Sequence, residues 1–376
     1  MFKLLASSLV KNNHKVWIIT NKIREEKYEQ KENLNIIFVK PTLSYDLGRL
    51  PTFSDNIRYT FNAVREGLKV IKKEKIDVIH SNNFAPALAG SILSSITSKP
   101  HVLTIHDVFS LCGRNYWKKW GAQSDVSKIN VMVSPIFEKW IIRLKHDCIH
   151  TVSDATRDDL VKFGSKKPIH VIHNSVSSRQ ENIKSETNPF QVIHVGRLVF
   201  YKNLEVIIRA INIAKKVEPK IKLVIAGNGP HQKTLEKLVK DSRSESNVEF
   251  RGYVSSKEKA ELISQSSALV FPSLCEGFGL VILEAFSLKR PVLVSNIRPM
   301  SDIVTHETNG YVLDPDNENE WAEHLLKITR NPSEASRMGQ NGSELLAKSY
   351  DLESMYQKVT SMYSEVLKHH THLKTI

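Results

Sequence analysis

The feature that most constrains the fold is an alternation of short, β-rich runs with longer runs of helical periodicity. The strand-like runs include VWIIT (16–20), HVLTI (101–105), QVIHV (191–195) and ALVF (268–271). Between them, apolar residues recur every three or four positions, as on one face of a helix. This alternation predicts an α/β chain of βαβ units with mostly parallel sheets.

The length of 376 residues suits two domains. Residues 177–189 are polar and aperiodic, so they are the best candidate for a linker. The predicted division is an N-terminal domain at 1–178, a linker at 179–190, a C-terminal domain at 191–350, and an amphipathic helix at 351–370 that crosses back to the N-terminal domain. We therefore expect two doubly wound (Rossmann-like) domains that face each other across a ligand-binding cleft.

The start of the chain departs from this plan. Apolar residues at Phe2, Leu5 and Leu9 predict that the chain begins with a helix. A doubly wound domain ordinarily opens with a strand and a Gly-rich turn. Either the domain lacks its first strand and Gly-rich loop, or the recorded start is not the biological one. A true start at Met1 predicts weakened stability and poor activity.

The charge of the chain indicates an anionic partner. Lys and Arg number 53 against 40 Asp and Glu, a formal net charge of +13, and residues 1–178 carry +11 of it, with 27 basic and 16 acidic side chains. No nucleic-acid reader motif accompanies this charge, so we expect no nucleic-acid partner. No apolar run approaches the roughly 20 residues that a membrane span requires. Any membrane contact is therefore predicted to be peripheral.

Two segments mix tryptophan with basic residues: NYWKKW (115–120) and IFEKWIIRLKH (136–146). This composition is typical of a helix that lies on an anionic membrane surface. A core-facing helix whose lysines are merely solvated accounts for the same residues, and both readings stay open.

The three cysteines, Cys112, Cys148 and Cys275, are widely spaced and form neither a disulfide framework nor a metal knuckle. Such usage is typical of a reducing compartment, and we expect a cytoplasmic protein, with peripheral contact on the cytoplasmic membrane face.

The densest cluster of candidate site residues is PSLCEGFGLVILEAF (272–286). Gly277 and Gly279 stand at a strand-to-helix turn, where backbone N–H groups and the helix dipole favour phosphate. If the helix begins near Glu276, then Glu284 lies about two turns into it and can accept hydrogen bonds from sugar hydroxyls. The simpler reading is that Glu276 caps the helix and Glu284 pairs with a lysine.

Two further clusters follow predicted strands. Arg197 and Lys202 flank the turn in HVGRLVFYKN (194–203), a pair of cations that suits a diphosphate or an ordinary solvated turn. Gly227 and Gly229 stand in AGNGP (226–230), which carries only two glycines of the dinucleotide-binding fingerprint and is weak evidence alone.

Together these clusters resemble the C-terminal domain of the family-4, or group 1, retaining glycosyltransferases of the GT-B fold. The resemblance rests on HVGRL-x3-K, LVIAGNGP, VEFRGYVS and, most specifically, the E-x7-E element from Glu276 to Glu284. The segments HVLTIHD, IHTVSDATRDDL and VIHNSV resemble landmarks of the N-terminal domain. Lys289 departs from the pattern, since the family usually has glycine there.

The resemblance implies a donor site in the C-terminal domain. Arg197 and Lys202 would hold the diphosphate of a UDP- or GDP-linked sugar, and Glu284 would bind the ribose hydroxyls. Glu276 and the backbone amides of Gly277, Phe278 and Gly279 would contact the sugar and phosphates. Gly227 and Gly229 would also line this donor site.

The resemblance likewise implies the reaction. His106 would lie near the transferring hexosyl group, which would pass with retention of anomeric configuration to a glycan, lipid or lipid-linked acceptor, as in cell-envelope glycan synthesis. No cofactor or metal is expected. The one Asp-x-Asp match, Asp314 to Asp316, reads as a turn. Two alternatives stay open: a truncated, weakly active or noncatalytic remnant that binds nucleotide sugars, and a nucleotide-sugar epimerase of the same fold.

Overall fold

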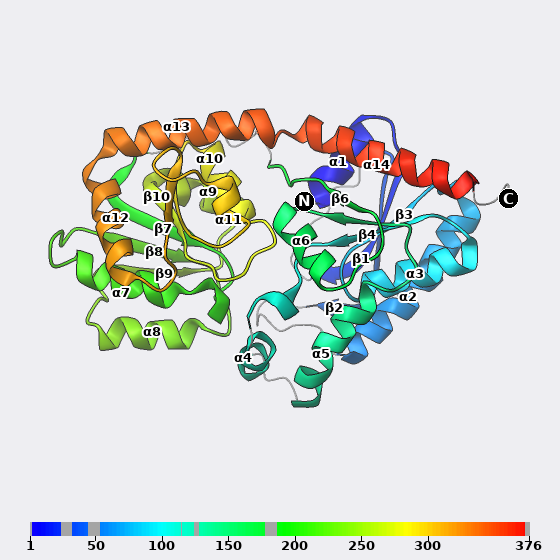
Figure 1. The fold of residues 1–376 in the computed structure, drawn as a ribbon, viewed down its shortest axis with the longest axis horizontal. Helices are drawn as coiled ribbons and strands as arrows, with labels where there is room; N and C mark the ends of the chain where they lie inside the picture. Colours follow the sequence, from blue (N-terminus) through cyan, green and yellow to red (C-terminus); the bar gives the residue numbers. More distant parts are fainter. Residues whose placement is uncertain are drawn as a thin grey trace. The chain divides into compact units, whose positions relative to one another are not determined.

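The fold was examined in a computed structural model that describes residues 2–23, 32–43, 53–113, 115–123, 128–176 and 186–372. Two compact units form the chain (Figure 1). Unit 1 comprises Met1–Asn174 and Leu352–Ile376, and unit 2 comprises Ser175–Asp351. Most of the predicted linker, 179–185, lies outside the described residues, and its last three residues belong to a strand.

The described part of unit 1 contains six parallel strands in two separate sheets. One sheet pairs β1 (Val16–Ile23) with β2 (Leu34–Leu43), and the other has the order β3 (Ile79–Ser81), β4 (His101–Ile105), β5 (Cys148–Thr151) and β6 (Ile169–Val171). Among the described residues, no strand joins the two sheets. The alternation in the sequence does not predict the strand β2. That the domain lacks its first strand stays a prediction.

The described residues of unit 1, which include the C-terminal helix, contain seven α-helices and one short 3-10 helix. They are α1 (Phe2–Lys11), α2 (Phe53–Lys73), α3 (Ala85–Thr97), η1 (Phe109–Leu111), α4 (Tyr116–Gln123), α5 (Lys128–Ile141), α6 (Asp154–Lys162) and α14 (Leu352–His372). The side chain of Ser153 caps α6 by accepting a hydrogen bond from the backbone of Thr156 at 3.1 Å. No described helix is long and apolar enough to cross a membrane.

The C-terminal helix α14 is part of the core of unit 1. Its apolar face, including Met355, Val359 and Met362, packs in one cluster with Leu5 and Leu9 of α1. A hydrogen-bonded chain of side chains continues inward from the same helix. Its members are Tyr363, His80, Thr104 and His150, joined at 2.6, 2.6 and 2.9 Å in that order. The far end of the sequence is therefore built into the sheet of the first unit.

Unit 2, over its described residues, is built on a six-stranded parallel sheet with helices on both faces (Figure 1). In spatial order the strands are β12 (Gly310–Leu313), β11 (Val292–Ser295), β10 (Ser266–Phe271), β7 (Asn188–Val195), β8 (Lys222–Ala226) and β9 (Val248–Gly252). Every residue of β10 and β11 is buried, as expected of central strands covered on both faces.

The helical elements of unit 2 follow these strands along the chain. They are η3 (Phe200–Lys202), α7 (Leu204–Ala214), α8 (Gln232–Asp241), α9 (Ser256–Gln265), α10 (Leu280–Ser287), α11 (Met300–Ile303), α12 (Glu318–Arg330) and α13 (Pro332–Ser349). A reciprocal capping box between Ser255 and Glu258 starts α9. The core includes the fully buried Trp321, whose indole N–H donates to the carbonyl of Asp314 at 2.9 Å. Two doubly wound units thus confirm the predicted α/β class.

Lys289 occupies a backbone position that favours glycine. It follows the last residues of α10 with φ of 55°, and its N–H donates to the carbonyl of Phe286 at 3.0 Å. A left-handed residue just past a helix end is usually glycine, because a Cβ there is strained by about 1–2 kcal/mol. Lysine at this position, where the family usually has glycine, therefore lowers the stability of the fold.

We predict that Lys289→Gly raises the free energy of unfolding by about 0.5–1 kcal/mol, since relief of the strain exceeds the extra entropy of glycine in the unfolded chain. Urea unfolding followed by circular dichroism measures the change. Lys289→Ala is the matched control, because it removes the same side chain but keeps the strained Cβ. Equal stabilisation by both variants would contradict the backbone argument.

Several histidines are buried as neutral side chains. Burial is the largest cause that lowers the pKa of His106, His146 and His150 to about 4, and neighbouring histidines contribute to the shift. Burial is also the largest cause that lowers the pKa of His194 to about 3. Because the unfolded chain takes up these protons near pH 6.5 and the folded chain does not, acid favours unfolding.

We therefore predict that the free energy of unfolding falls as the pH is lowered from 6.5 towards 4, the window between the unfolded and folded pKa values. Each such histidine adds a slope of up to about 1.4 kcal/mol per pH unit. Urea unfolding at pH 7.5, 6.5, 5.5 and 5.0 measures the slope before most carboxylates titrate. A flat profile across that range would contradict the prediction.

Candidate active site

The sheet of unit 2 reverses its direction of growth between β7 and β10. The chain runs from β7 to β8 and β9 on one side, and from β10 to β11 and β12 on the other. Ligands of doubly wound sheets bind at the carboxyl ends of the strands beside such a reversal. The loops that follow β7 and β10 hold most of the predicted donor-site residues. They are joined by a hydrogen bond from the N–H of Leu274 to the carbonyl of Tyr201 at 2.8 Å.

The centre of this site is an ion pair between Lys202 and Glu276. Lys202 ends the 3-10 turn η3 after β7, and Glu276 lies in the loop after β10. Only 11% of the lysine side chain and 14% of the glutamate side chain are exposed. The ammonium nitrogen also lies 4.7 Å from the ring centroid of Phe271, a cation–π contact. The structure thus brings together two residues that are 74 positions apart in the sequence.

Arg197 is held by the backbone on either side of it. The N–H of Gly196 donates to the carbonyl of Ala226 at 3.0 Å, and the N–H of Leu198 donates to the carbonyl of Asn228 at 3.0 Å. These bonds fasten the loop after β7 to the loop after β8. Arg197 therefore stands at the same edge of the sheet as Lys202.

Gly227 and Gly229 have a packing role in this arrangement. A Cβ at Gly227 would overlap the carbonyl oxygen of Gly196, and one at Gly229 would overlap that of Leu198. Only glycine lets the two loops approach so closely. That these glycines also contact a donor stays a prediction.

The helix after β10 begins later than its sequence suggests. Gly279, with φ of 86°, is the residue before α10, which starts at Leu280, and no side chain caps this end. Glu276 therefore does not cap the helix, and Glu284 lies only in its second turn, which corrects the estimate of two full turns. The left-handed glycine ends the loop and sets this boundary. An uncapped helix start is a favourable place for a phosphate, beside the amides of residues 277–279.

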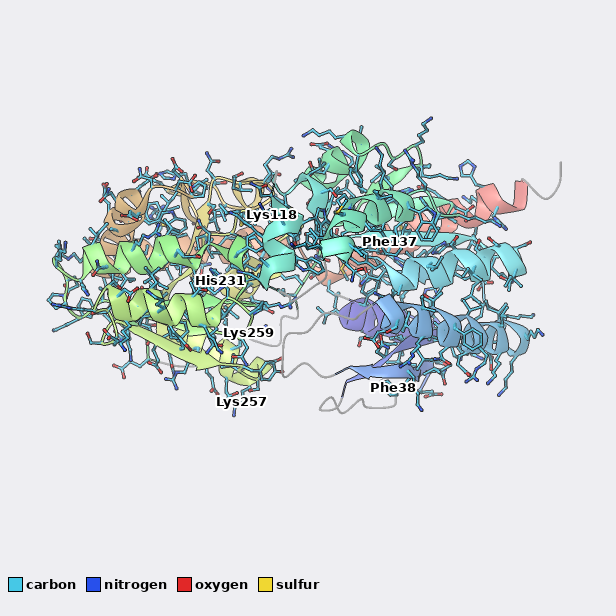
Figure 2. All side chains as sticks on the ribbon, turned by 90° about the horizontal axis from the view of Figure 1, so that it is seen from below. Phe38, Lys118, Phe137, His231, Lys257 and Lys259 are labelled. Atoms are coloured by element: carbon cyan, nitrogen blue, oxygen red, sulfur yellow. The ribbon has the colours of Figure 1, made fainter. Side chains whose placement is uncertain are left out.

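Glu284 forms an ion pair with Lys259 of α9, at 2.6 Å (Lys259 is labelled in Figure 2). The side chains are 19% and 23% exposed. This pairing is the simpler of the two readings of Glu284. The binding of ribose hydroxyls by Glu284 stays a prediction, and Lys259 is a residue that no motif in the sequence reveals.

His194 opens the HVGRL-x3-K element, but no role is predicted for it from the sequence. It lies in β7, fully buried, with its ring stacked on Phe271 and its Nδ1 3.1 Å from the carbonyl of Val270. Lys202 contributes to the low pKa of His194, after burial. A neutral imidazole therefore lies next to the lysine of the central ion pair. Its place within an apolar strand, at the start of HVGRL-x3-K, was the available signal.

His106 belongs to unit 1, whereas the other predicted site residues belong to unit 2. It directly follows β4, and both its backbone N–H and its backbone carbonyl form hydrogen bonds. Its N–H donates to the side-chain oxygen of Asn83 at 3.3 Å, and its carbonyl accepts from the hydroxyl of Thr156 at 3.0 Å. Burial and the neighbouring His150 lower its pKa, so His106 is neutral at pH 7.

Asp314 and Asp316 form a turn, as their sequence context predicts. The N–H of Asp316 donates to the carboxylate of Asp314 at 2.9 Å, and Pro315 accepts a hydrogen bond at its carbonyl from Asn203 at 2.8 Å. Across the described ranges, no three His, Cys, Asp or Glu side chains gather as a metal site would require.

Two doubly wound α/β units, with a cationic, glycine-lined edge at a sheet reversal, match the GT-B fold found in glycosyltransferases. The solved structures agree with this fold. Sucrose-phosphate synthase from Thermosynechococcus elongatus superposes with a TM-score of 0.80 at 21% identity, covering 98% of this chain and 93% of that one. Anabaena HepE in complex with UDP and glucose gives a TM-score of 0.69 at 18% identity, covering 89% and 87%. These likenesses show the fold.

Sequence comparison gives the family. Residues 2–180 match Glycosyltransferase Family 4, and residues 177–345 match Glycosyl transferases group 1. An uncharacterised glycosyltransferase of Methanocaldococcus jannaschii is 28% identical, over 91% of this chain and 88% of its own. The O-antigen chain mannosyltransferase RfbU of Salmonella typhimurium is 29% identical, over 59% and 60%. The chain belongs to the family-4, group 1 glycosyltransferases, as its motifs predict.

The central ion pair makes a specific prediction about stability. Removing one partner leaves a largely buried, uncompensated charge, so Lys202→Met should lower the free energy of unfolding by about 3 kcal/mol. The double variant Lys202→Met with Glu276→Gln should recover most of this loss, because no unpaired charge remains. A double-mutant cycle by urea unfolding measures the coupling. Additive losses would show that the two side chains do not act as a pair.

Proposed function

We propose that the protein transfers a hexosyl group from a UDP- or GDP-linked sugar to a glycan, lipid or lipid-linked acceptor, with retention of anomeric configuration. The observation that carries this proposal is the Lys202–Glu276 pair beside the uncapped start of α10, at the reversal of the unit 2 sheet. The occurrence of UDP and glucose in Anabaena HepE supports the donor class. The O-antigen role of the Salmonella relative supports a cell-envelope glycan acceptor.

The proposed chemistry breaks the bond between the anomeric carbon and the diphosphate oxygen. A bond then forms from an acceptor hydroxyl oxygen to that carbon, and the hydroxyl proton leaves with the nucleoside diphosphate. Negative charge grows on the departing diphosphate, so preorganised cations and amides lower the barrier. Arg197 and Lys202 supply the cations, and the amides of Gly277, Phe278 and Gly279 supply the dipoles.

Donor binding in this proposal exchanges the partner of one ion pair and keeps the other. The diphosphate takes over Lys202 from Glu276, which becomes available to the hydroxyls of the sugar. The ribose hydroxyls approach Glu284, which Lys259 orients through their 2.6 Å contact. Gly227 and Gly229 keep the loop after β8 against the Arg197 loop while this happens. His106 is the residue of unit 1 that we assign to the transferring sugar.

We propose that no divalent metal is needed, because Arg197, Lys202 and the α10 start together offset the diphosphate charge. The expectation that the cysteines form no disulfide is wrong for Cys112 and Cys275, which are disulfide-bonded in the structure, whereas Cys148 is free. A cytoplasmic location stays a proposal that the cysteines do not support. Two alternative functions would give different experimental results. An epimerase would convert the donor without an acceptor, and a noncatalytic remnant would bind nucleotide without transferring sugar.

The test is to incubate the protein with UDP- and GDP-sugars and a panel of glycan and lipid-linked acceptors, with and without a chelator. We expect transfer that persists in the chelator, and proton NMR of the product shows the anomeric configuration. Glu284→Gln should weaken nucleoside-diphosphate binding by about ten-fold in calorimetry, as expected for losing a charge-assisted hydrogen bond. Lys259→Met should weaken it less, because the carboxylate remains.

Glu261→Gln, also on α9, is the matched control, since this side chain is 40% exposed and pairs with Lys257, and the variant should bind as the wild type does. Loss of transfer on chelation would refute metal independence. Inversion at the anomeric carbon would refute retention. No binding of either nucleoside diphosphate would refute the whole proposal.

A further inference from the structure

The helix α5 leaves an apolar stripe exposed along its whole length. The stripe, which we call the α5 stripe, consists of Ile129, Met132, Val133, Ile136 and Trp140. Exposed fractions reach 72% at Ile129, 75% at Met132 and 69% at Ile136. Spacings of three, four and seven place these residues on one helical face. A contiguous apolar strip of this kind marks an interaction surface.

The opposite face of α5 is fixed to the body of unit 1. Glu138 is buried, and its carboxylate accepts from the backbone N–H groups of Phe109 at 2.7 Å and Ser110 at 2.9 Å. Phe137 packs against the core cluster that contains Ile141. The helix is therefore anchored on one side, and the exposure of the α5 stripe does not come from a loosely attached segment. This separates the two readings of the segment, since Phe137 faces the core and Trp140 does not.

Basic side chains border the α5 stripe. Lys128 and Lys139 are exposed on α5, and Lys118 and Lys119 are exposed on the adjoining α4. Figure 2 labels Lys118 on α4 and Phe137 on α5. The only acidic residue within the described residues of α4 and α5 is Glu138, which faces inward. An apolar strip with a cationic border matches a bilayer whose headgroups are anionic.

We propose that α4 and α5 dock on an anionic lipid bilayer, with the α5 stripe in the headgroup region and the lysines on the lipid phosphates. A second copy of the chain suits this surface less well. A two-fold contact between copies would bring the same lysines against each other, without an exposed carboxylate on either helix to neutralise them. The charge of +11 over residues 1–178 adds a longer-range attraction to anionic lipid.

The experiment is flotation of the full chain with vesicles of phosphatidylglycerol and phosphatidylcholine, and with vesicles of phosphatidylcholine alone. We expect binding to the anionic vesicles only, and stronger binding at low salt. Met132→Ser with Ile136→Ser should weaken binding at least ten-fold, because two apolar side chains no longer enter the interface. Lys128→Gln with Lys139→Gln should weaken it roughly five-fold for each lysine removed.

The matched control is Ile57→Ser with Phe61→Ser on α2, which removes two exposed apolar side chains outside the proposed surface. Its binding should stay within two-fold of the wild type. Circular dichroism confirms that all variants fold, as expected for exposed positions.

Equal flotation of the Met132/Ile136 variant and the wild type would overturn the proposal. So would a wild type that stays with the unbound fraction, or a dimer in light scattering that the same substitutions disperse. The assay contains no sugar donor, so its outcome is independent of the proposed transfer.

Discussion

The pairing of β7 with β10 is the contact on which the candidate site depends. Strands 70 residues apart in the sequence become neighbours, and parallel pairing brings their carboxyl ends to one edge. Only then can Lys202, which follows one strand, meet Glu276, which follows the other. The glycines at 227 and 229 extend the same edge by letting the next loop press against residues 196–198. The arrangement of the candidate site in unit 2 is thus a consequence of sheet order.

Much of this could be predicted from the sequence, because buried parallel strands carry near-continuous apolar runs that stand out locally. The predicted runs HVLTI, QVIHV and ALVF all fall within observed strands. The strand β2 was not predicted. Neighbouring parallel strands are usually joined by a helix, so the apolar run that follows β1 was not assigned to a second strand. The start of α10 was placed too early because only the left-handed backbone of Gly279, which no pattern announces, sets the boundary.

The partners of the site residues were harder to predict than the residues themselves. Spacing along the chain identifies Glu276 and Glu284 as a unit, but their cations come from elsewhere in the fold. Lys202 approaches across the sheet reversal, and Lys259 projects from the preceding helix α9. His194 is similar, since its position under Lys202 follows from strand pairing rather than from any local pattern. Ion pairing between distant segments is a tertiary property, and local sequence carries no record of it.

The nearly buried Lys202–Glu276 pair also bears on how the site can bind a diphosphate. Each charge has lost most of its hydration, and the two stabilise each other at short range over the ring of Phe271. A diphosphate brings two or more negative charges, so it can replace the carboxylate without leaving the ammonium group desolvated and alone. An uncharged ligand cannot make that replacement, because it would leave both side chains unpaired in a poorly hydrated place. In the proposed donor complex, the diphosphate would pair with Lys202 while the sugar hydroxyls would donate to Glu276, so we expect this edge of the sheet to favour an anionic ligand.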